Sequence, residues 1–350
     1  MKFLIFADPH WSSYSSIVRS RGTKYSTRLH NLIDTMNWIE RTAEANQCDQ
    51  IICLGDFFDK SELNSEEVSA LNEVKWSGLP HWFIVGNHEM GRSTLEFSSS
   101  HIFGLNLDFQ VVDKPTVYSF CDTSIVFLPY ILENNRQPLT EYLKDFKLND
   151  NTIIMSHNDI AGMQMGTFIS KDGFSIEEIE QSCSLFINGH LHNGSQIGKN
   201  IINVGNITGQ NFSEDAFQYK HQALLLDTSV RSIQWLENPY SLKFYKLDLM
   251  NMRPHYDDKE IQDTLSSLAA PAIVTVKVTP ECVFVAKDLV SASNNILEAR
   301  IIVDTTQSST SSSVKYEATS IDHISKFSEY VTQMIANSEL LREELEKVLQ

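Results

Sequence analysis

The stretch "INGHLHNG", residues 187–194, places two histidines, His190 and His192, on either side of a single leucine. The apolar run "SLFI" leads into it, and a glycine lies on each side of the two histidines. Residues i and i+2 of an extended segment point in the same direction. We therefore expect both imidazoles to face one point at the end of a buried strand.

Four other motifs repeat this arrangement earlier in the chain. Each places a carboxylate, an amide oxygen or an imidazole just after an apolar run, beside a glycine or a turn. One such motif alone is usually a turn or a packed histidine, whereas all of them in this order predict a shared site. The motifs are Asp8-Pro9-His10, Gly55-Asp56-Phe57-Phe58-Asp59, Gly86-Asn87-His88-Glu89 and "MSHND", which contains His157.

The residue types of these motifs indicate the chemistry. Asp, Asn and His supply mixed nitrogen and oxygen ligands, which suit manganese, iron or zinc rather than a thiolate site or an all-oxygen calcium site. Asp56 is the natural bridge, because one carboxylate has two oxygens to share. Two ions about 4 Å apart can bind one phosphate diester, activate a water molecule and hold the leaving oxygen. The motifs therefore predict a two-metal site.

The hydrophobic pattern predicts a layered α/β or α+β core over residues 1–238. Short apolar runs alternate with amphipathic segments, and residues 27–46 and 64–78 have the spacing of helices, with Ser65 as the expected cap of the second. Several expected strands end in one of the motifs above, and open α/β sheets build their sites at the carboxyl ends of strands.

The sequence changes in character near residue 239. Residues 239–304 contain two strand-like runs, 271–280 and 296–306, and a short helical pattern at 259–269, which together predict a small α/β domain that caps the DNA. Residues 305–320 are rich in Ser and Thr and are expected to form a flexible linker. Residues 321–350 have an apolar stripe at helical spacing, which predicts helices that bind a partner or pack on the chain itself. The partner-binding candidates on this stripe are Ile324, Phe327 and Val331.

Composition limits the function classes. The net charge of −17 argues against nucleic-acid binding, because basic charge supplies most of that affinity. A metal site and a small basic surface can offset this charge.

Five cysteines without a CxxC pair suit a reducing cytoplasm, and no apolar run is long enough to span a bilayer. A local basic cluster is either a solvated loop or a surface that contacts nucleic-acid phosphates; it consists of Arg19, Arg21, Lys24 and Arg28.

The complete set of motifs resembles the calcineurin-like metallophosphoesterase superfamily. This resemblance implies a four-layer sandwich of two mixed sheets flanked by helices, and two divalent cations held by residues that match the family pattern. It implies that His88 protonates the leaving group, a role that suits an imidazole. The implied ligands of one cation are Asp8, His10, Asp56 and His192, and those of the other are Asp56, Asn87, His157 and His190.

Within this superfamily, the motifs together with "NVGNITGQNFSED" (residues 203–215) resemble most the nuclease subunit of SbcCD-type DNA double-strand-break repair complexes and phage recombination endonucleases. That resemblance implies a DNA exonuclease or endonuclease that acts in repair, recombination or replication in a bacterial or phage-infected cytoplasm. It implies Mn²⁺ as the cation, with Mg²⁺, Fe²⁺ or Zn²⁺ as alternatives. The implied partners are DNA, a coiled-coil ATPase of the SbcC type and a second copy of the chain within a heterotetramer. The alternatives are another phosphodiesterase or phosphatase of the superfamily, and a metal-site interaction scaffold.

Overall fold

The computed structural model describes residues 1–304 apart from 16, 18–23, 121–122, 166–167 and 253–254. The expected linker and the expected helical segment, with Ile324, Phe327 and Val331, lie outside the described residues, as do Arg19 and Arg21 of the basic cluster. In the described part, no helix is long and apolar enough to cross a membrane.

Two six-stranded mixed sheets form the main body. In the first, the parallel strands β1, β2, β3 and β6 continue into the antiparallel pair β15 and β16. In the second, β8, β9, β12 and β14 are parallel, and β7 and β13 are antiparallel edge strands. The first sheet comprises β1 (Lys2–Phe6), β2 (Gln50–Cys53), β3 (His81–Ile84), β6 (Phe109–Val112), β15 (Gln222–Asp227) and β16 (Ser232–Glu237). The second comprises β7 (Thr116–Phe120), β8 (Thr123–Leu128), β9 (Thr152–Ser156), β12 (Leu185–Asn188), β13 (Ser195–Ile197) and β14 (Ile201–Asn203).

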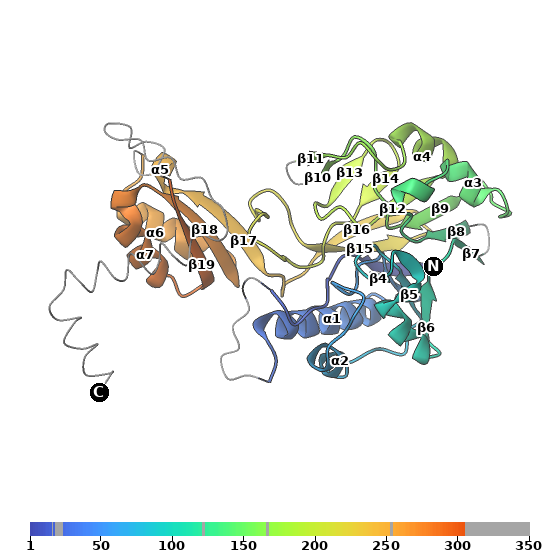
Figure 1. The fold of residues 1–350 in the computed structure, drawn as a ribbon, viewed down its shortest axis with the longest axis horizontal. Helices are drawn as coiled ribbons and strands as arrows, with labels where there is room; N and C mark the ends of the chain where they lie inside the picture. Colours follow the sequence, from blue (N-terminus) through green and yellow to red (C-terminus); the bar gives the residue numbers. More distant parts are fainter. Residues whose placement is uncertain (16, 18–23, 121–122, 166–167, 253–254, 305–350) are drawn as a thin grey trace. The chain divides into compact units, whose positions relative to one another are not determined.

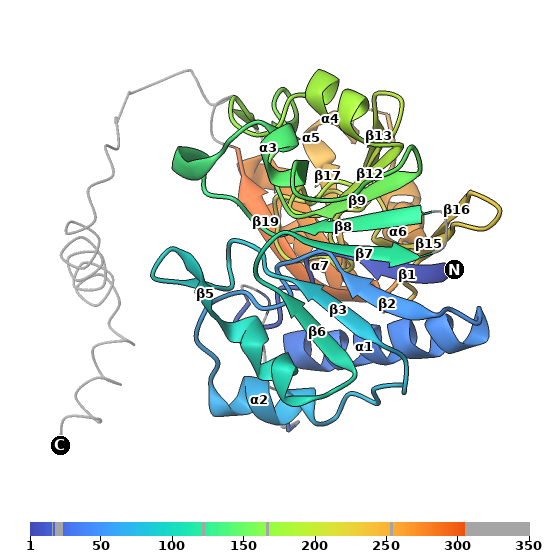
Figure 2. The same ribbon diagram turned by 90° about the vertical axis from the view of Figure 1, so that its right-hand side faces the viewer.

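The side-chain alternation of β1 shows how the layers form. Phe3 and Ile5 point into the core between the two sheets, whereas Leu4 and Phe6 point into the core beneath α1 (Thr27–Ala45) and α2 (Ser65–Leu71). On the far side of the second sheet, α3 (Leu139–Leu143) and α4 (Ile176–Ser182) cover a third core. Figure 2 shows the resulting order of helices, sheet, sheet and helices. The predicted four-layer sandwich is confirmed.

The start of α2 differs from the prediction. Asn64, and not Ser65, is the N-cap: its side chain accepts a hydrogen bond from the amide of Glu67 at 2.9 Å, and the Glu67 carboxylate accepts one from the amide of Asn64 at 2.9 Å. This reciprocal capping box satisfies two amides that the first turn leaves free. The helix also ends at Leu71, well before residue 78.

Residues 243–303 form a separate three-stranded parallel sheet, β17-β18-β19, with helices packed on it (Figure 1, orange). The runs at 271–280 and 296–306 supply β18 and β19, and the pattern at 259–269 supplies α6. The sequence did not predict helix α7, because its β-branched residues favour a strand as much as a helix. The elements are β17 (Lys243–Asp248), α5 (Leu249–Met252), α6 (Asp258–Ser267), β18 (Ala272–Val278), η3 (Pro280–Cys282), α7 (Val283–Ser291) and β19 (Ile296–Val303).

Short elements occupy the connections of the main body. They are the hairpin of β4 (Met90–Gly91) and β5 (Thr94–Ser98), the hairpin of β10 (Gln164–Met165) and β11 (Phe168–Ile169), and the 3₁₀ turns η1 (Ser99–Leu105) and η2 (Glu133–Asn135).

Candidate metal centre

The two sheets bring the five motifs together at one edge. Asp8, Asp56 and Asn87 follow the parallel strands β1, β2 and β3, and His157 and His190 follow the parallel strands β9 and β12. Hydrogen bonds close the loops on one another. The Asp8 amide donates to the Gly55 carbonyl at 3.1 Å, and the His190 amide donates to Asp8 Oδ2 at 3.0 Å.

The backbone is strained where the candidate ligands lie. Asp8, His10, Asp56 and His190 have φ values of 52°, 47°, 47° and 70°. Non-glycine residues seldom adopt this left-handed region, and such strain costs about 1–3 kcal/mol per residue. Half of the eight non-glycine residues with positive φ in the described part are therefore candidate ligands. This concentration marks the edge as a functional site.

Two glycines allow the side chains to converge. A Cβ atom on Gly86 would lie 2.2 Å from Asp56 Oδ1, and one on Gly55, whose φ is 112°, would lie 2.3 Å from His157 Nδ1. Any side chain at either position would displace a candidate ligand, so the glycines in "LGD" and "VGN" serve the close approach of the loops.

The candidate ligands form two groups around Asp56. Asp8, His10 and His192 offer ligand atoms that all lie within 4.8 Å of one another, and Asp56, His157 and His190 do the same. His10, Asp56 and His88 form a further group of this kind, which shares His10 with the first and Asp56 with the second. The carboxylate oxygen Oδ2 of Asp56 is 3.2 Å from His157 Nε2 and 3.8 Å from His10 Nε2. Asp56 therefore lies where one carboxylate can serve both groups.

Asn87 belongs to the second group. Its Oδ1 lies 3.2 Å from His157 Nε2, the atom that also faces Asp56. All seven residues that the sequence predicted to bind metal thus lie at one edge of the sheets, and their division between two cations stays a prediction.

In three of the histidines, one ring nitrogen contacts an oxygen atom of the protein that orients the ring. Such a contact fixes the ring and leaves the other nitrogen available for a metal. The contacts are His10 Nδ1 with Asp59 Oδ1 at 3.1 Å, His157 Nδ1 with the Leu54 carbonyl at 2.8 Å, and His190 Nε2 with Asp159 Oδ1 at 3.0 Å.

Buried polar atoms at the site lack protein partners. Among the described residues, Asp8 Oδ1 and His10 Nε2 are buried without a hydrogen bond. Unpaired buried polar groups are costly, and a bound cation would satisfy both atoms. Together with the mixed oxygen and nitrogen donors, this shows that the residues present fit divalent cations.

Electrostatics at the site depends on burial and on Asp56. Burial alone would raise the pKa of Asp56, but the nearby His157 holds it below its usual range. Burial opposes the charged form of His157, yet the Asp56 carboxylate raises its pKa to about 9. Burial lowers the pKa of His192 to about 3, so this imidazole is neutral near pH 7, the form that binds metal. Burial raises the pKa of Asp8.

His88 differs from the other histidines because its side chain is 44% exposed. Its backbone amide donates to Asp56 Oδ1 at 2.9 Å, and its ring lies edge-on to His10 with centroids 4.6 Å apart. Its Nδ1 lies 3.1 Å from the Asp59 carbonyl oxygen, which can only accept a hydrogen bond. Nδ1 therefore carries a proton, and Nε2 is the atom available to a substrate.

The sequence reading gave no role to three carboxylates that support this centre. Asp59 orients His10, and Asp159 orients His190. Glu89 is fully buried and accepts hydrogen bonds from the amides of Gly86 and Phe58 at 2.7 and 3.1 Å, so it joins the loops after β2 and β3. All three lie inside the five motifs, and that position was the only signal for them in the sequence.

The two described residues of the basic cluster, Lys24 and Arg28, differ in their exposure. Arg28 is 3% exposed, and its guanidinium donates to the carbonyls of Pro9 and Gly209, both at 2.7 Å. The expectation of a solvent-exposed Arg28 is therefore wrong, because helix α1 directs this side chain under the first motif. Lys24 is exposed, but its ammonium group forms an ion pair with Glu73.

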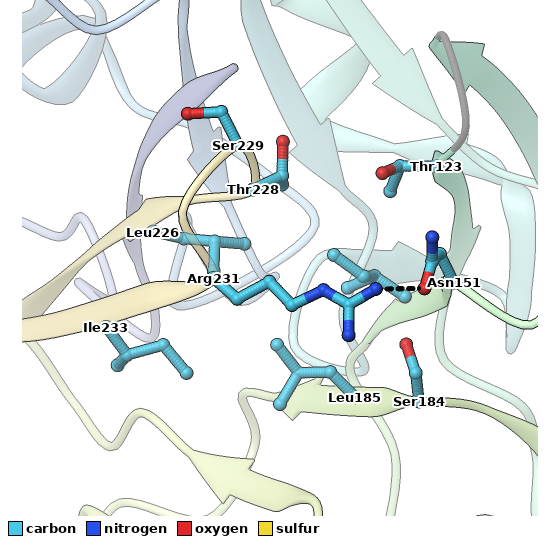
Figure 3. A pocket seen from close by; sticks show the side chains of 10 residues that line it. Thr123, Asn151, Ser184, Leu185, Leu226, Thr228, Ser229, Arg231 and Ile233 are labelled. Carbon is cyan, nitrogen blue, oxygen red and sulfur yellow. Dashed lines mark hydrogen bonds between the residues drawn. The ribbon is translucent and has the colours of Figure 1, made fainter.

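A cavity of about 430 Å³ elsewhere in the main body is lined by none of the candidate ligands (Figure 3). It is lined by Ile153 and Leu185, near the beginnings of β9 and β12, whereas the candidate ligands follow the ends of these strands. Arg231 reaches across it to Asn151, with its Nη2 2.6 Å from Asn151 Oδ1 (Figure 3). This cavity is therefore separate from the metal centre.

Comparison with known proteins identifies the family. Residues 1–194 match the family described as Calcineurin-like phosphoesterase, and the chain belongs to that family. Calcineurin-like phosphoesterases use dinuclear metal sites, in agreement with the two ligand groups. No curated protein matches the sequence.

The chain is also similar, at low sequence identity, to several solved structures. An archaeal phosphodiesterase is 12% identical, with a TM-score of 0.36, over 68% of this chain and 99% of its own. A dimetal phosphatase from Danio rerio is 11% identical, with a TM-score of 0.40, over 68% and 99%. The purple acid phosphatase PPD1 from yellow lupin (Lupinus luteus) seeds is 12% identical, with a TM-score of 0.44, over 68% and 51%.

Proposed function

We propose that this protein is the metal-dependent nuclease subunit of a DNA-processing complex of the SbcCD type and that it hydrolyses DNA phosphodiesters. The proposed hydrolytic activity rests on the position of Asp56 between two ligand groups, with the exposed His88 beside them. The separate α/β segment of residues 243–303 and the sequence "NVGNITGQNFSED" support the nuclease assignment.

The proposed ligands are the two groups described above. Two divalent cations bound there, with Mn²⁺ as the preferred ion, would act as Lewis acids on the phosphoryl oxygens and lower the pKa of a water molecule. Asp59, Asp159 and the Leu54 carbonyl hold the three imidazoles in fixed orientations, so the ligand set is organised before substrate arrives.

His88 completes the proposed chemistry. With Nδ1–H donated to the Asp59 carbonyl, a doubly protonated His88 can give the proton on Nε2 to the departing oxygen of the diester. The amide of His88 is anchored on Asp56, so the distance between the proton donor and the metal ligands is fixed by the backbone.

The assignment is tested by comparing substrates. Purified protein with Mn²⁺ is offered linear single-stranded and duplex DNA, a cyclic nucleotide diester and a phosphopeptide, with Asp56→Asn as the inactive control. We expect Mn²⁺-dependent DNA cleavage that EDTA abolishes. Hydrolysis of the phosphopeptide or the cyclic nucleotide without DNA cleavage would contradict the nuclease proposal.

A small-molecule phosphodiesterase is the second candidate. The net charge of −17 disfavours DNA binding, and in the described part of the basic cluster Arg28 is buried and Lys24 is paired with Glu73. If the protein is a nuclease, we expect its partner to supply much of the affinity for DNA. A metal-site scaffold is less consistent with the site, because every expected ligand position is filled.

The proposed partner is a coiled-coil ATPase that binds residues 321–350, and the proposed assembly contains two copies of each chain. An isolated amphipathic helix is marginally stable in water, so its apolar stripe needs a surface to cover it. Deleting residues 315–350 is expected to preserve Mn²⁺-dependent cleavage of single-stranded DNA and to abolish co-purification with the ATPase. Normal co-purification of the truncated chain would overturn this role.

A further inference from the structure

A small hollow adjoins the metal centre on the side of the first motif. Its volume is about 230 Å³, below the roughly 300 Å³ at which sites for drug-sized ligands begin, so it suits a single ring-sized group. Its lining includes His10, Tyr14, Arg28, Asp59, Gln210 and Asn211. His10 and Asp59 also belong to the metal centre, so the hollow and the centre are contiguous.

Tyr14 is the unusual member of this set. Its side chain is 83% exposed, although aromatic rings of this size are normally packed. Its backbone is anchored nonetheless: the Tyr14 amide donates to Ser12 Oγ at 3.1 Å, and Ser12 in turn contacts the buried Glu67 at 3.3 Å. The structure therefore presents an aromatic face, from a backbone hydrogen-bonded to Ser12, at a hollow beside the metal centre.

The remaining walls are polar and held in place. Gln210 donates from Nε2 to the Asp8 carbonyl at 2.7 Å, which fixes its amide against the first motif. The guanidinium of Arg28 is fixed by the carbonyls of Pro9 and Gly209. Amide and carboxylate groups can pair with the donors and acceptors along the edge of a heterocycle. A ring that is flat, apolar on its faces and polar at its edge is the chemical class that matches both kinds of wall.

We propose that Tyr14 stacks on the nucleobase next to the scissile phosphodiester, with Gln210 and Asn211 facing the edge of that base. This inference rests on the proposed function, because it places a nucleotide phosphate at the metal centre. Stacking on an aromatic side chain tolerates any base, so the subsite contributes affinity for unpaired nucleotides without strong sequence preference.

The test compares two single-stranded oligonucleotides that differ only in whether the nucleotide beside the cleaved bond carries a base or is abasic. Tyr14→Ala should raise KM for the intact oligonucleotide roughly tenfold, the effect of losing one stacked base, with kcat nearly unchanged. The wild type should already show the higher KM on the abasic oligonucleotide, and Tyr14→Ala should add nothing there. Tyr14→Phe should behave as the wild type, and Tyr256→Ala, at another exposed tyrosine, serves as the matched control.

A binding measurement gives a second readout that does not depend on turnover. With EDTA present, the fluorescence of a 2-aminopurine oligonucleotide should be quenched by the wild type and by Tyr14→Phe, and not by Tyr14→Ala. Unchanged KM and unchanged quenching in Tyr14→Ala, with DNA cleavage intact, would overturn the subsite and leave the nuclease proposal standing. A wild type that cleaves neither oligonucleotide would overturn the nuclease proposal and this subsite with it.

Discussion

The backbone amide of His190 donates a hydrogen bond to Asp8 Oδ2 at 3.0 Å and so joins two residues 182 positions apart in the sequence. This hydrogen bond connects the motif that contains His190 with the motif that contains Asp8. His190 is also held from its side chain, since Nε2 lies 3.0 Å from Asp159 Oδ1 and Asp159 Oδ2 lies 3.5 Å from Arg136 Nη2. The orientation of one candidate ligand therefore depends on Asp159 and Arg136, which belong to none of the ligand groups.

Asp159→Asn tests this dependence. The amide has the size of the carboxylate but lacks its charge, so it holds the protonated Nε2 of His190 less firmly. We expect the cation bound by the Asp56, His157 and His190 group to bind about 10–100-fold more weakly. Mn²⁺ titration followed by electron paramagnetic resonance measures this affinity, with the exposed Asp172→Asn as control. Equal affinities in the two variants would exclude an orienting role for Asp159.

His88→Ala separates proton donation from metal binding. Because His88 is exposed at the rim and its Nδ1 faces a carbonyl oxygen, we expect both cations to remain bound. Turnover should fall by roughly 10²–10⁴, the usual effect of losing a general acid. Elemental analysis together with single-turnover kinetics checks both points. If the variant loses a cation, His88 is a ligand and its assigned role is wrong.

Glu214 gives a pH-dependent prediction for stability away from the candidate ligands. Burial raises its pKa to about 7 from an ordinary value of 4.5, so the folded protein holds this proton at pH values where the unfolded chain has released it. The stabilising contribution of Glu214 is therefore present at low pH and is lost as the pH rises through about 7.

Glu214→Gln removes this dependence. On lowering the pH from 8 to 6, the wild type should gain about 1 kcal/mol in the free energy of unfolding relative to the variant. Urea unfolding in EDTA at both pH values measures the difference, with the exposed Glu177→Gln as control. The same change in free energy for wild type and Glu214→Gln would show that Glu214 titrates normally.

The basic cluster is tested by charge reversal. Replacing Arg19, Arg21 and Lys24 together with Glu should weaken DNA binding on every sequence and flatten its dependence on salt. Lys24→Ala alone should have little effect, because its ammonium group already pairs with Glu73. Fluorescence anisotropy over a salt series measures both. Unchanged affinity of the triple variant at low salt would identify the cluster as an ordinary solvated surface.

The sequence predicted the parts of this structure that depend on local pattern. The apolar runs before Asp8, Asp56 and His157 are buried strands, and their alternation between two cores follows from the period of a strand. Since parallel strands end at the same edge, the motifs after them meet there. The resemblance to a known superfamily then supplied the division of the ligands into two groups.

Other features depend on tertiary contacts that no local pattern shows. The burial of Arg28 under the first motif requires carbonyls of Pro9 and Gly209, which lie 19 and 181 positions away. The support of His190 by Asp159 is a contact across 31 positions. The choice of Asn64 over Ser65 as a cap was a local matter, but both residue types are good caps and the sequence did not discriminate between them.

The sharing of Asp56 by two cations is tested by counting the cations that each chain binds. Protein stripped with EDTA, reloaded with Mn²⁺ and passed through a desalting column is analysed for metal per chain, in the wild type and in Asp56→Asn. We expect two Mn²⁺ per chain in the wild type and loss of most of the metal in the variant, because both ligand groups adjoin Asp56. Full occupancy in Asp56→Asn, or a single cation in the wild type, would show that two cations do not share Asp56.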